Sequence, residues 1–360
     1  MLQAIAATPR PTGKTAIAKA RERVARELRS LGYDVRELPF TFSGFPGQLA
    51  TPLMGGAAAI IIGLAGRWGA EGRGPAPLIL LVAGSIALYG AGTWLAKRSV
   101  LEAPVLRQRG INLEATRPGG GATTIWLAAH LDSKWQRVPT LVRTAGIVLV
   151  ILGYLLTLGL AVISAVGGHT AFFFWGIAAI VTLTGTIPVV LSTVGSGSPG
   201  ALDNASGVAT VIAAARRLGN VSGVGILITD AEELGLAGAR AWSRDARTAM
   251  VLNCDGVDDF GEIQVMFTGR RPAHLLAAVD RATSVTGIGH QAGRLIPGVL
   301  TDSVAFSDAG FSSVTFARGS LRSLLRVHTS RDDLAHLRGT GIAETATLMA
   351  ATVRELGETH

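Results

Sequence analysis

Four long apolar stretches interrupt the polar sequence of this 360-residue chain. Each approaches the roughly 20 apolar residues that are needed to cross about 30 Å of hydrocarbon. A helix buried in a soluble core would normally keep a polar stripe, and the last three stretches carry no charge along their whole apolar length. The pattern therefore predicts about four transmembrane helices, at residues 49–66, 76–96, 144–166 and 171–191.

The polar sequence shows short apolar runs that alternate with amphipathic ones. Residues 224–229 (VGILIT) are typical of a buried strand, and residues 16–31 have the pattern of an amphipathic helix with a basic outer face. Strands that alternate with helices favour an α/β fold, with a mixed, largely parallel sheet sandwiched by helices. We also expect strands at 33–42, 123–129, 250–254 and 263–267, and helices at 206–218, 236–244 and 341–356.

The apolar stretches are predicted to pair into two hairpins. A hairpin returns the chain to the side of the membrane from which it started. The polar parts 1–48, 97–143 and 192–360 can then form the first, second and third parts of one catalytic domain. Residues 49–96 and 144–191 are the two transmembrane hairpins that interrupt it.

Composition supports a membrane protein. Hydrophobic residues make up 48% of the chain and charged residues only 16%, against about 25% charged in a typical soluble domain. The net charge of +8 comes mostly from scattered arginines, with no basic block interleaved with aromatics. This favours an anionic lipid surface and argues against nucleic acid. The only cysteine is Cys254, so an intrachain disulfide scaffold is excluded.

Polar clusters follow several of the apolar runs. The first is His130-Leu-Asp132, where Asp132 could orient the imidazole toward a metal. Asp203 opens a helix, and there an ordinary N-cap competes with a ligand. Glu232 and Glu233 follow a buried strand, where paired carboxylates are costly unless a metal and a proton-transfer role compensate them. A solvated pair at a helix start is the alternative.

Two further clusters complete the series. Asp255 follows the run at 250–254 and could be a turn former or a ligand. His328 lies in Val-His-Thr-Ser-Arg-Asp, where a single histidine could equally be structural. Cys254 fits a small buried residue better than a zinc ligand.

The order of these clusters is more specific than any one of them. His-x-Asp, Asp-Asn, Glu-Glu, Asp and His-Thr-x-x-Asp closely resemble the co-catalytic zinc aminopeptidases of metallopeptidase family twenty-eight, which includes aminopeptidase Y-like enzymes. The resemblance covers nearly all the polar sequence and excludes the two hairpins, which look like insertions.

The resemblance implies two Zn²⁺ per chain. His130 and Asp255 would bind the first zinc, Glu233 and His328 the second, and Asp203 both. Two histidine nitrogens and three carboxylates suit zinc as a borderline ion. Glu232 would be the general base that acts on a metal-bridging water.

The resemblance also implies supporting residues. Asp132 would act with the catalytic set by orienting one histidine, and Asp332 would support the other histidine from outside the ligand set. The family often has a Ser-Asp-His triplet that borders the substrate pocket, whereas Thr301–Asp302–Ser303 stands here. The preferred substrate residue therefore stays open.

The predicted function is a membrane-anchored aminopeptidase that hydrolyses N-terminal peptide bonds. Related amide chemistry (carboxypeptidase or glutaminyl cyclase-like) and a non-catalytic membrane protein that retains the fold are the alternatives. The expected partners are a peptide substrate and a lipid bilayer; the oligomeric state is not predicted.

We expect a multi-pass protein of the cell membrane. The N-terminal apolar run is too short for a signal peptide, and Pro9–Arg10–Pro11 interrupts it. Basic flanks favour a cytoplasmic catalytic side, whereas some relatives work outside the cytoplasm. The flanking residues are Lys97, Arg98, Lys134, Arg137 and Arg143.

Overall fold

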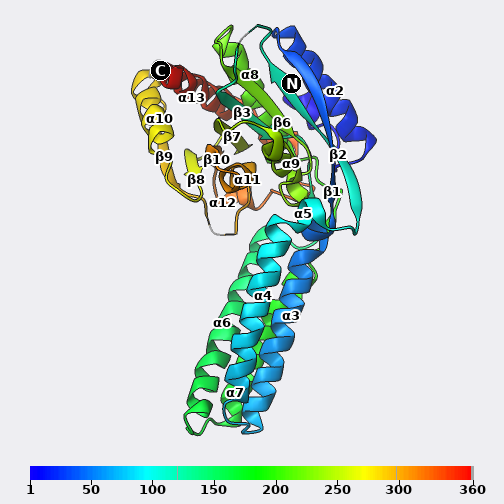
Figure 1. Ribbon diagram of the computed structural model, residues 1–360, viewed down its shortest axis with the longest axis vertical. Helices are drawn as coiled ribbons and strands as arrows, with labels where there is room; N and C mark the ends of the chain where they lie inside the picture. The colour runs from blue at the N-terminus through cyan, green and yellow to red at the C-terminus, as the bar shows by residue number, and fades with distance from the viewer. Residues whose placement is uncertain (120, 297, 358–360) are drawn as a thin grey trace. The chain divides into compact units, whose positions relative to one another are not determined.

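The chain forms two compact units in the computed structural model (Figure 1), which describes residues 1–119, 121–296 and 298–357. Unit 1 comprises Met1–Phe42, Arg107–Trp135 and Ser196–His360, and unit 2 comprises Ser43–Leu106 and Gln136–Gly195. The predicted segments 97–143 and 192–360 include residues 120, 297 and 358–360, which lie outside the described residues.

Unit 1 is built on an eight-stranded sheet with the order β1-β2-β6-β3-β7-β10-β8-β9. Strands β6, β3, β7 and β10 run parallel to their neighbours in this series, whereas β2 and β8 pair antiparallel with β6 and β10. The predicted mixed, largely parallel sheet is confirmed. In chain order the strands are β1 (Asp34–Ser43), β2 (Arg107–Thr116), β3 (Ile125–His130), β6 (Val224–Thr229), β7 (Met250–Val257), β8 (Glu262–Phe267), β9 (His290–Arg294) and β10 (Ser312–Gly319).

Helices cover both faces of this sheet because its central strands are apolar on both sides. Every residue of β3 and β6 is buried. Neighbouring residues of a strand point to opposite faces, so Leu127 packs into one apolar cluster and Trp126 into another. The Leu127 cluster includes α2 (Thr15–Ser30), α8 (Gly207–Leu218), α10 (Ala273–Thr286) and α13 (Thr340–Gly357), and the Trp126 cluster includes α9 (Ala237–Asp245) and α11 (Asp302–Asp308).

Short helical turns complete unit 1 and carry several of the polar clusters. They are α1 (Leu2–Ile5), the π-helical η1 (Ala201–Ser206), the 3₁₀-helical η2 (Glu232–Leu234) and η3 (Leu334–His336), and α12 (Leu321–Leu324). Turn η1 leads directly into α8, and η2 follows β6 after two residues.

The register of the parallel strands places polar residues at one edge of the sheet. His130 at the end of β3 pairs with Thr229 at the end of β6, and Ala128 pairs with Asn253 of β7. Residues that follow these positions therefore emerge beside one another, beyond the carboxyl ends of the strands, where α/β sheets bind ligands.

Unit 2 contains four helices that are long and apolar enough to cross a membrane, as the sequence predicts. Ile60, Ile86 and Phe172 on these helices are 64%, 69% and 76% exposed. The helices are α3 (Phe45–Ala70), α4 (Ala76–Lys97), α6 (Thr140–Ala165) and α7 (Phe172–Val190), and the short elements are α5 (Ser99–Glu102) and β5 (Val194–Gly195). The short strand β4 (Trp135–Gln136) has its first residue in unit 1 and its second in unit 2.

Small residues allow these four helices to pack closely. A Cβ atom on Gly69 would lie 2.2 Å from the ring of Trp175, and one on Gly153 would lie 2.1 Å from Oγ1 of Thr182. Close approach at small residues is the usual basis of helix association in lipid. The interior is thus filled by helix–helix contacts, while large apolar side chains face outward.

Candidate metal centre

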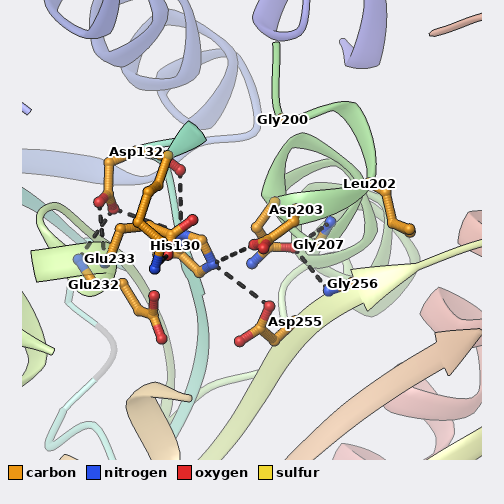
Figure 2. Close-up of polar contacts among 12 residues, drawn as sticks. His130, Asp132, Gly200, Leu202, Asp203, Gly207, Glu232, Glu233, Asp255 and Gly256 are labelled. Carbon is orange, nitrogen blue, oxygen red and sulfur yellow. Dashed lines mark hydrogen bonds and ion pairs between the residues drawn. The ribbon is translucent and has the colours of Figure 1, made fainter. Parts of the chain in front are cut away.

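Asp132 connects the end of β3 to the segment that follows β6. Its Oδ1 and Oδ2 accept hydrogen bonds from the backbone N–H groups of Glu232 (3.1 Å) and Glu233 (3.2 Å) (Figure 2). Nδ1 of His130 lies 3.2 Å from the backbone oxygen of Asp132 and 3.5 Å from its Oδ1. Asp132 therefore positions three of the predicted site residues through main-chain and imidazole contacts.

Asp332 holds the backbone of η1 at Asp203. The carboxylate of Asp332 accepts hydrogen bonds from the backbone N–H groups of Leu202 (2.6 Å) and Asp203 (3.1 Å). The sequence predicts that Asp332 supports His328; these bonds show it holding the segment of Asp203. Burial raises the pKa of Asp332 to about 7.

Asn204 fastens the same turn to β7. Its Nδ2 donates to the backbone oxygen of Cys254 (2.9 Å), and its Oδ1 accepts from the N–H groups of Gly207 (2.9 Å) and Gly256 (3.1 Å). The capping role considered for this cluster thus belongs to Asn204, which leaves the carboxylate of Asp203 directed at other side chains.

The five predicted ligands come together as two groups that share Asp203. The groups are His130, Asp203 and Asp255, and Asp203, Glu233 and His328, and in each the ligand atoms lie within 4.8 Å of one another. Nε2 of His130 lies 3.1 Å from Oδ1 of Asp203 and 3.4 Å from Oδ1 of Asp255 (Figure 2). Nε2 of His328 lies 3.0 Å from Oδ2 of Asp203 and 3.2 Å from Oε1 of Glu233.

The donor set fits divalent zinc. Imidazole nitrogens and carboxylate oxygens are ordinary zinc ligands. Among the described residues, Nε2 of His130 and Oε1 of Glu233 are buried without a hydrogen bond. Buried polar atoms normally have a partner, and both atoms lie in the groups described above. One cation in each group would satisfy them.

Burial and neighbouring charges shift the pKa values of the acidic residues apart. Burial raises the pKa of Glu232 well above its usual value, and the nearby carboxylates of Glu233 and Asp255 add to the rise. Burial also raises the pKa of Glu233, but His328 and Lys134 outweigh it, and the net pKa is about 2. The pKa of Glu232 is thus raised, whereas that of its neighbour Glu233 is lowered. A raised pKa suits Glu232 for proton transfer, and a lowered pKa suits Glu233 for metal binding.

The sequence identifies Lys134 only as one of the basic residues that flank the apolar stretches. Its Nζ lies 2.6 Å from Oε2 of Glu233, and the two side chains are 14% and 5% exposed. The contact joins residues 99 positions apart, so no local pattern predicts it.

Backbone strain is concentrated beside the predicted ligands. Ala231, Leu236 and His328 have φ values of 59°, 61° and 62°. Left-handed backbone is costly for residues with a side chain and clusters at functional sites. Two of these residues flank the Glu232–Glu233 pair, and the third is itself a predicted ligand.

The Thr301–Asp302–Ser303 triplet is fully buried. Oγ1 of Thr301 lies 2.8 Å from Oγ of Ser303, and Oγ1 of Thr229 donates to the carboxylate of Asp302. Burial raises the pKa of Asp302 to about 7, although His130 opposes this rise. Asp302 thus lies within electrostatic range of His130 and Asp255 in the first ligand group.

Comparisons with known proteins support the family suggested by the motifs. The family model "Peptidase family M28" matches residues 185–353. No curated protein matches the sequence.

Solved structures share the fold at low sequence identity. A zinc aminopeptidase from Bacillus subtilis has a TM-score of 0.57 at 16% identity, with 99% of this chain and 93% of that chain covered. An aminopeptidase from Aneurinibacillus sp. strain AM-1 has a TM-score of 0.56 at 14% identity, with 98% and 92% covered. A glutaminyl cyclase from Porphyromonas gingivalis has a TM-score of 0.53 at 14% identity, with 100% and 99% covered.

At these identities the structures establish the fold, and the family model establishes the sequence relationship. The order of the motifs predicts peptidase family M28, and the match of that family model to residues 185–353 agrees with this prediction.

Proposed function

We propose that this chain is a membrane-anchored di-zinc metallopeptidase of the aminopeptidase type. The observation that carries the proposal is the position of Asp203. Its Oδ1 faces His130 and its Oδ2 faces His328, each within 3.1 Å of the imidazole Nε2. A carboxylate that offers one oxygen to each of two ligand groups is suited to bridge two cations.

The remaining ligands complete two sites. Asp255 joins the group of His130. Glu233 joins the group of His328. When bound, two zinc ions would polarise the scissile carbonyl as Lewis acids and acidify a water molecule.

Glu232 is the proposed general base. It is buried at 7% exposure, and Asp132 fixes its backbone. Its raised pKa brings a carboxylate toward the range in which a general base works best. Glu232 takes the proton from the attacking water and returns it to the nitrogen of the leaving amine.

An aminopeptidase reaction is favoured over the related amide chemistries. Two of the structural relatives described above are named aminopeptidases. The glutaminyl cyclase relative has a comparable fold, so cyclisation is the second candidate. Mass spectrometry of the products separates the two reactions, because hydrolysis adds a water to the substrate whereas cyclisation of an N-terminal glutamine releases ammonia.

Zinc analysis combined with a peptide-library assay tests the metallopeptidase proposal. We expect two zinc ions per chain and release of N-terminal residues. Substitution Glu232→Gln should lower turnover by about 10²–10⁴-fold while zinc content stays at the wild-type value. The matched control is Glu262→Gln, an exposed residue of β8, which should keep full activity. A wild-type protein that binds two zinc ions and cleaves no peptide in the library would refute the peptidase assignment.

Membrane anchoring is proposed for the hairpins at 49–96 and 144–191. It is supported by the four apolar helices of unit 2 and their exposed side chains. We expect the chain to stay with the membrane pellet in alkaline carbonate and to need detergent for release. Protease accessibility in oriented vesicles then tests the cytoplasmic side that the basic flanks favour. Release into the supernatant by carbonate alone would contradict a multi-pass topology.

A further inference from the structure

Arg10 is fully buried in unit 1, and the proposed reaction does not use it. Its Nε donates to the backbone oxygen of Leu131 (2.9 Å) and its Nη2 to that of Gly200 (2.9 Å). Its Nη1 donates to the backbone oxygens of Ile5 (3.0 Å) and Pro199 (2.5 Å). Burial of a guanidinium is costly unless it is hydrogen-bonded. Four carbonyl acceptors meet that need and tie distant segments together.

The segments joined by Arg10 carry predicted ligands. Leu131 lies between His130 and Asp132, and Pro199 and Gly200 immediately precede η1, which bears Asp203. The guanidinium therefore contacts both sides of the first ligand group through the main chain.

Ser133 strengthens the same junction. Its Oγ donates to the backbone oxygen of Ser198 (3.0 Å) and accepts from the N–H group of Arg10 (2.9 Å). Its own N–H donates to the backbone oxygen of Arg10 (3.1 Å). The N-terminal segment, the end of β3 and the approach to η1 are thus held by one cluster.

Gly200 allows the close approach on which this cluster depends. Its φ is 61°, a conformation that favours glycine. An added Cβ would lie 2.5 Å from Cβ of Ser133 and 3.1 Å from Nη2 of Arg10. The backbone at Gly200 is therefore in direct contact with the cluster.

The position of the cluster in the chain suggests its role. The chain leaves unit 1 after Trp135 and returns at Ser196, so residues 136–195 of unit 2 separate His130 from Asp203 in sequence. We propose that Arg10 is a positioning residue that fixes the spacing of the His130 and Asp203 segments at this interruption. The inference rests on the proposed metal centre, because the spacing matters only if both residues bind the same ion.

The test compares zinc affinity and amide exchange in four purified full-length proteins. They are the wild type, Arg10→Met, Arg10→Lys and the control Arg117→Met. Arg117 also donates to two backbone carbonyls, those of Leu31 and Gly219, but outside the ligand segments. Amide hydrogen exchange is followed over residues 198–206, and kcat and KM are measured separately.

We expect Arg10→Met to weaken zinc binding by about 10-fold or more, because loss of a residue that supports metal ligands commonly lowers metal affinity by that much. Amide hydrogen exchange over residues 198–206 should become faster. kcat should fall while KM stays near its wild-type value. Arg10→Lys should recover little, because one ammonium cannot reproduce the guanidinium fork. Arg117→Met should lose stability without a change in zinc affinity.

Wild-type zinc affinity in Arg10→Met, or an equal loss in Arg117→Met, would overturn the inference. If Arg10→Met does not fold, Ser133→Ala takes its place, because it removes two bonds of the cluster. A smaller loss of zinc affinity in the same direction is then expected, and an unchanged affinity would overturn the inference. A wild type that binds no zinc would instead refute the metal centre. In that case, faster amide exchange in Arg10→Met would still show that Arg10 holds the segments of His130 and Asp203 together.

Discussion

The two halves of the candidate metal centre are built on different kinds of backbone. His130 is the last residue of strand β3, and Asp255 lies in strand β7, where its pairing with β10 shifts register. Glu233 lies in the short turn η2, and His328 itself has a φ of 62°. The first half is thus placed by the hydrogen-bonded sheet, whereas the second depends on strained turns that surrounding contacts must hold.

The two halves also differ in charge. Burial raises the pKa of Asp255, although His130 opposes the rise. Glu233 is held at a pKa of about 2 by His328 and Lys134 despite its burial. Neighbouring positive charge therefore stabilises the carboxylate of Asp255 less than that of Glu233, which has Lys134 beside it. We expect the His130 half to bind zinc more tightly than the His328 half.

Asp203→Asn is expected to have the largest effect, because both halves share this residue. An amide oxygen carries no charge and its nitrogen cannot bind a cation, so both zinc ions should be lost. Activity should fall by at least about 10³-fold, as for removal of an essential catalytic group. Metal analysis and peptide turnover check this, with Asp34→Asn on the exposed start of β1 as the control. Retention of both ions would disprove a shared ligand.

Lys134→Met should act mainly on the half of Glu233 and His328. The ammonium lies 2.6 Å from Oε2 of Glu233, and a divalent ion beside that carboxylate would be repelled by it. Removing one positive charge at such a distance should tighten zinc binding at the second site by about 10-fold. Stepwise zinc titration checks this, and the control is Lys19→Met on the exposed face of α2. A weaker second site would mean that Lys134 positions Glu233 for the metal.

The same contrast explains what the sequence could predict. His130 and Asp255 follow short apolar runs, and the position of polar residues after such runs indicates the edge of a parallel sheet. The order of all five predicted ligands indicates the family, and the structure brings these residues together. The α/β class and the four apolar helices are likewise evident from hydrophobic patterning.

Other features depend on contacts between distant residues. Lys134 pairs with Glu233 across 99 positions, and Arg10 binds backbone oxygens up to 190 positions away. A carbonyl acceptor leaves no mark on the sequence, so neither role could be inferred from local pattern. Strand β10 also escapes prediction, because its residues Ser312–Gly319 mix polar and apolar side chains without an apolar run of the length seen in β6.

Asp302→Asn is expected to have the smallest effect on the two halves of the candidate metal centre. Asp302 contacts neither half directly and interacts only electrostatically with His130 and Asp255. Its pKa is raised from 3.8 to about 7 by burial. A carboxyl group with a raised pKa favours the folded state below its unfolded pKa, and this contribution is lost as the pH rises through the folded pKa. The contribution of Asp302 to the stability of the wild type should therefore fall between about pH 4 and pH 7, by about 1.4 kcal/mol for each pH unit that separates its unfolded and folded pKa values.

The side chain of Asn at position 302 cannot ionise, but its amide oxygen can still accept the hydrogen bond that Thr229 donates to Asp302 in the wild type. The stability of the variant should stay flatter over the same pH range, with the gain over wild type largest above pH 7. Thermal unfolding in detergent with a chelator present measures this without added charge from bound ions, and Asp34→Asn serves as the exposed control. Parallel profiles for the wild type and Asp302→Asn would show that the buried carboxyl is ionised in the folded protein throughout, and that the field of the nearby His130 outweighs burial at this position.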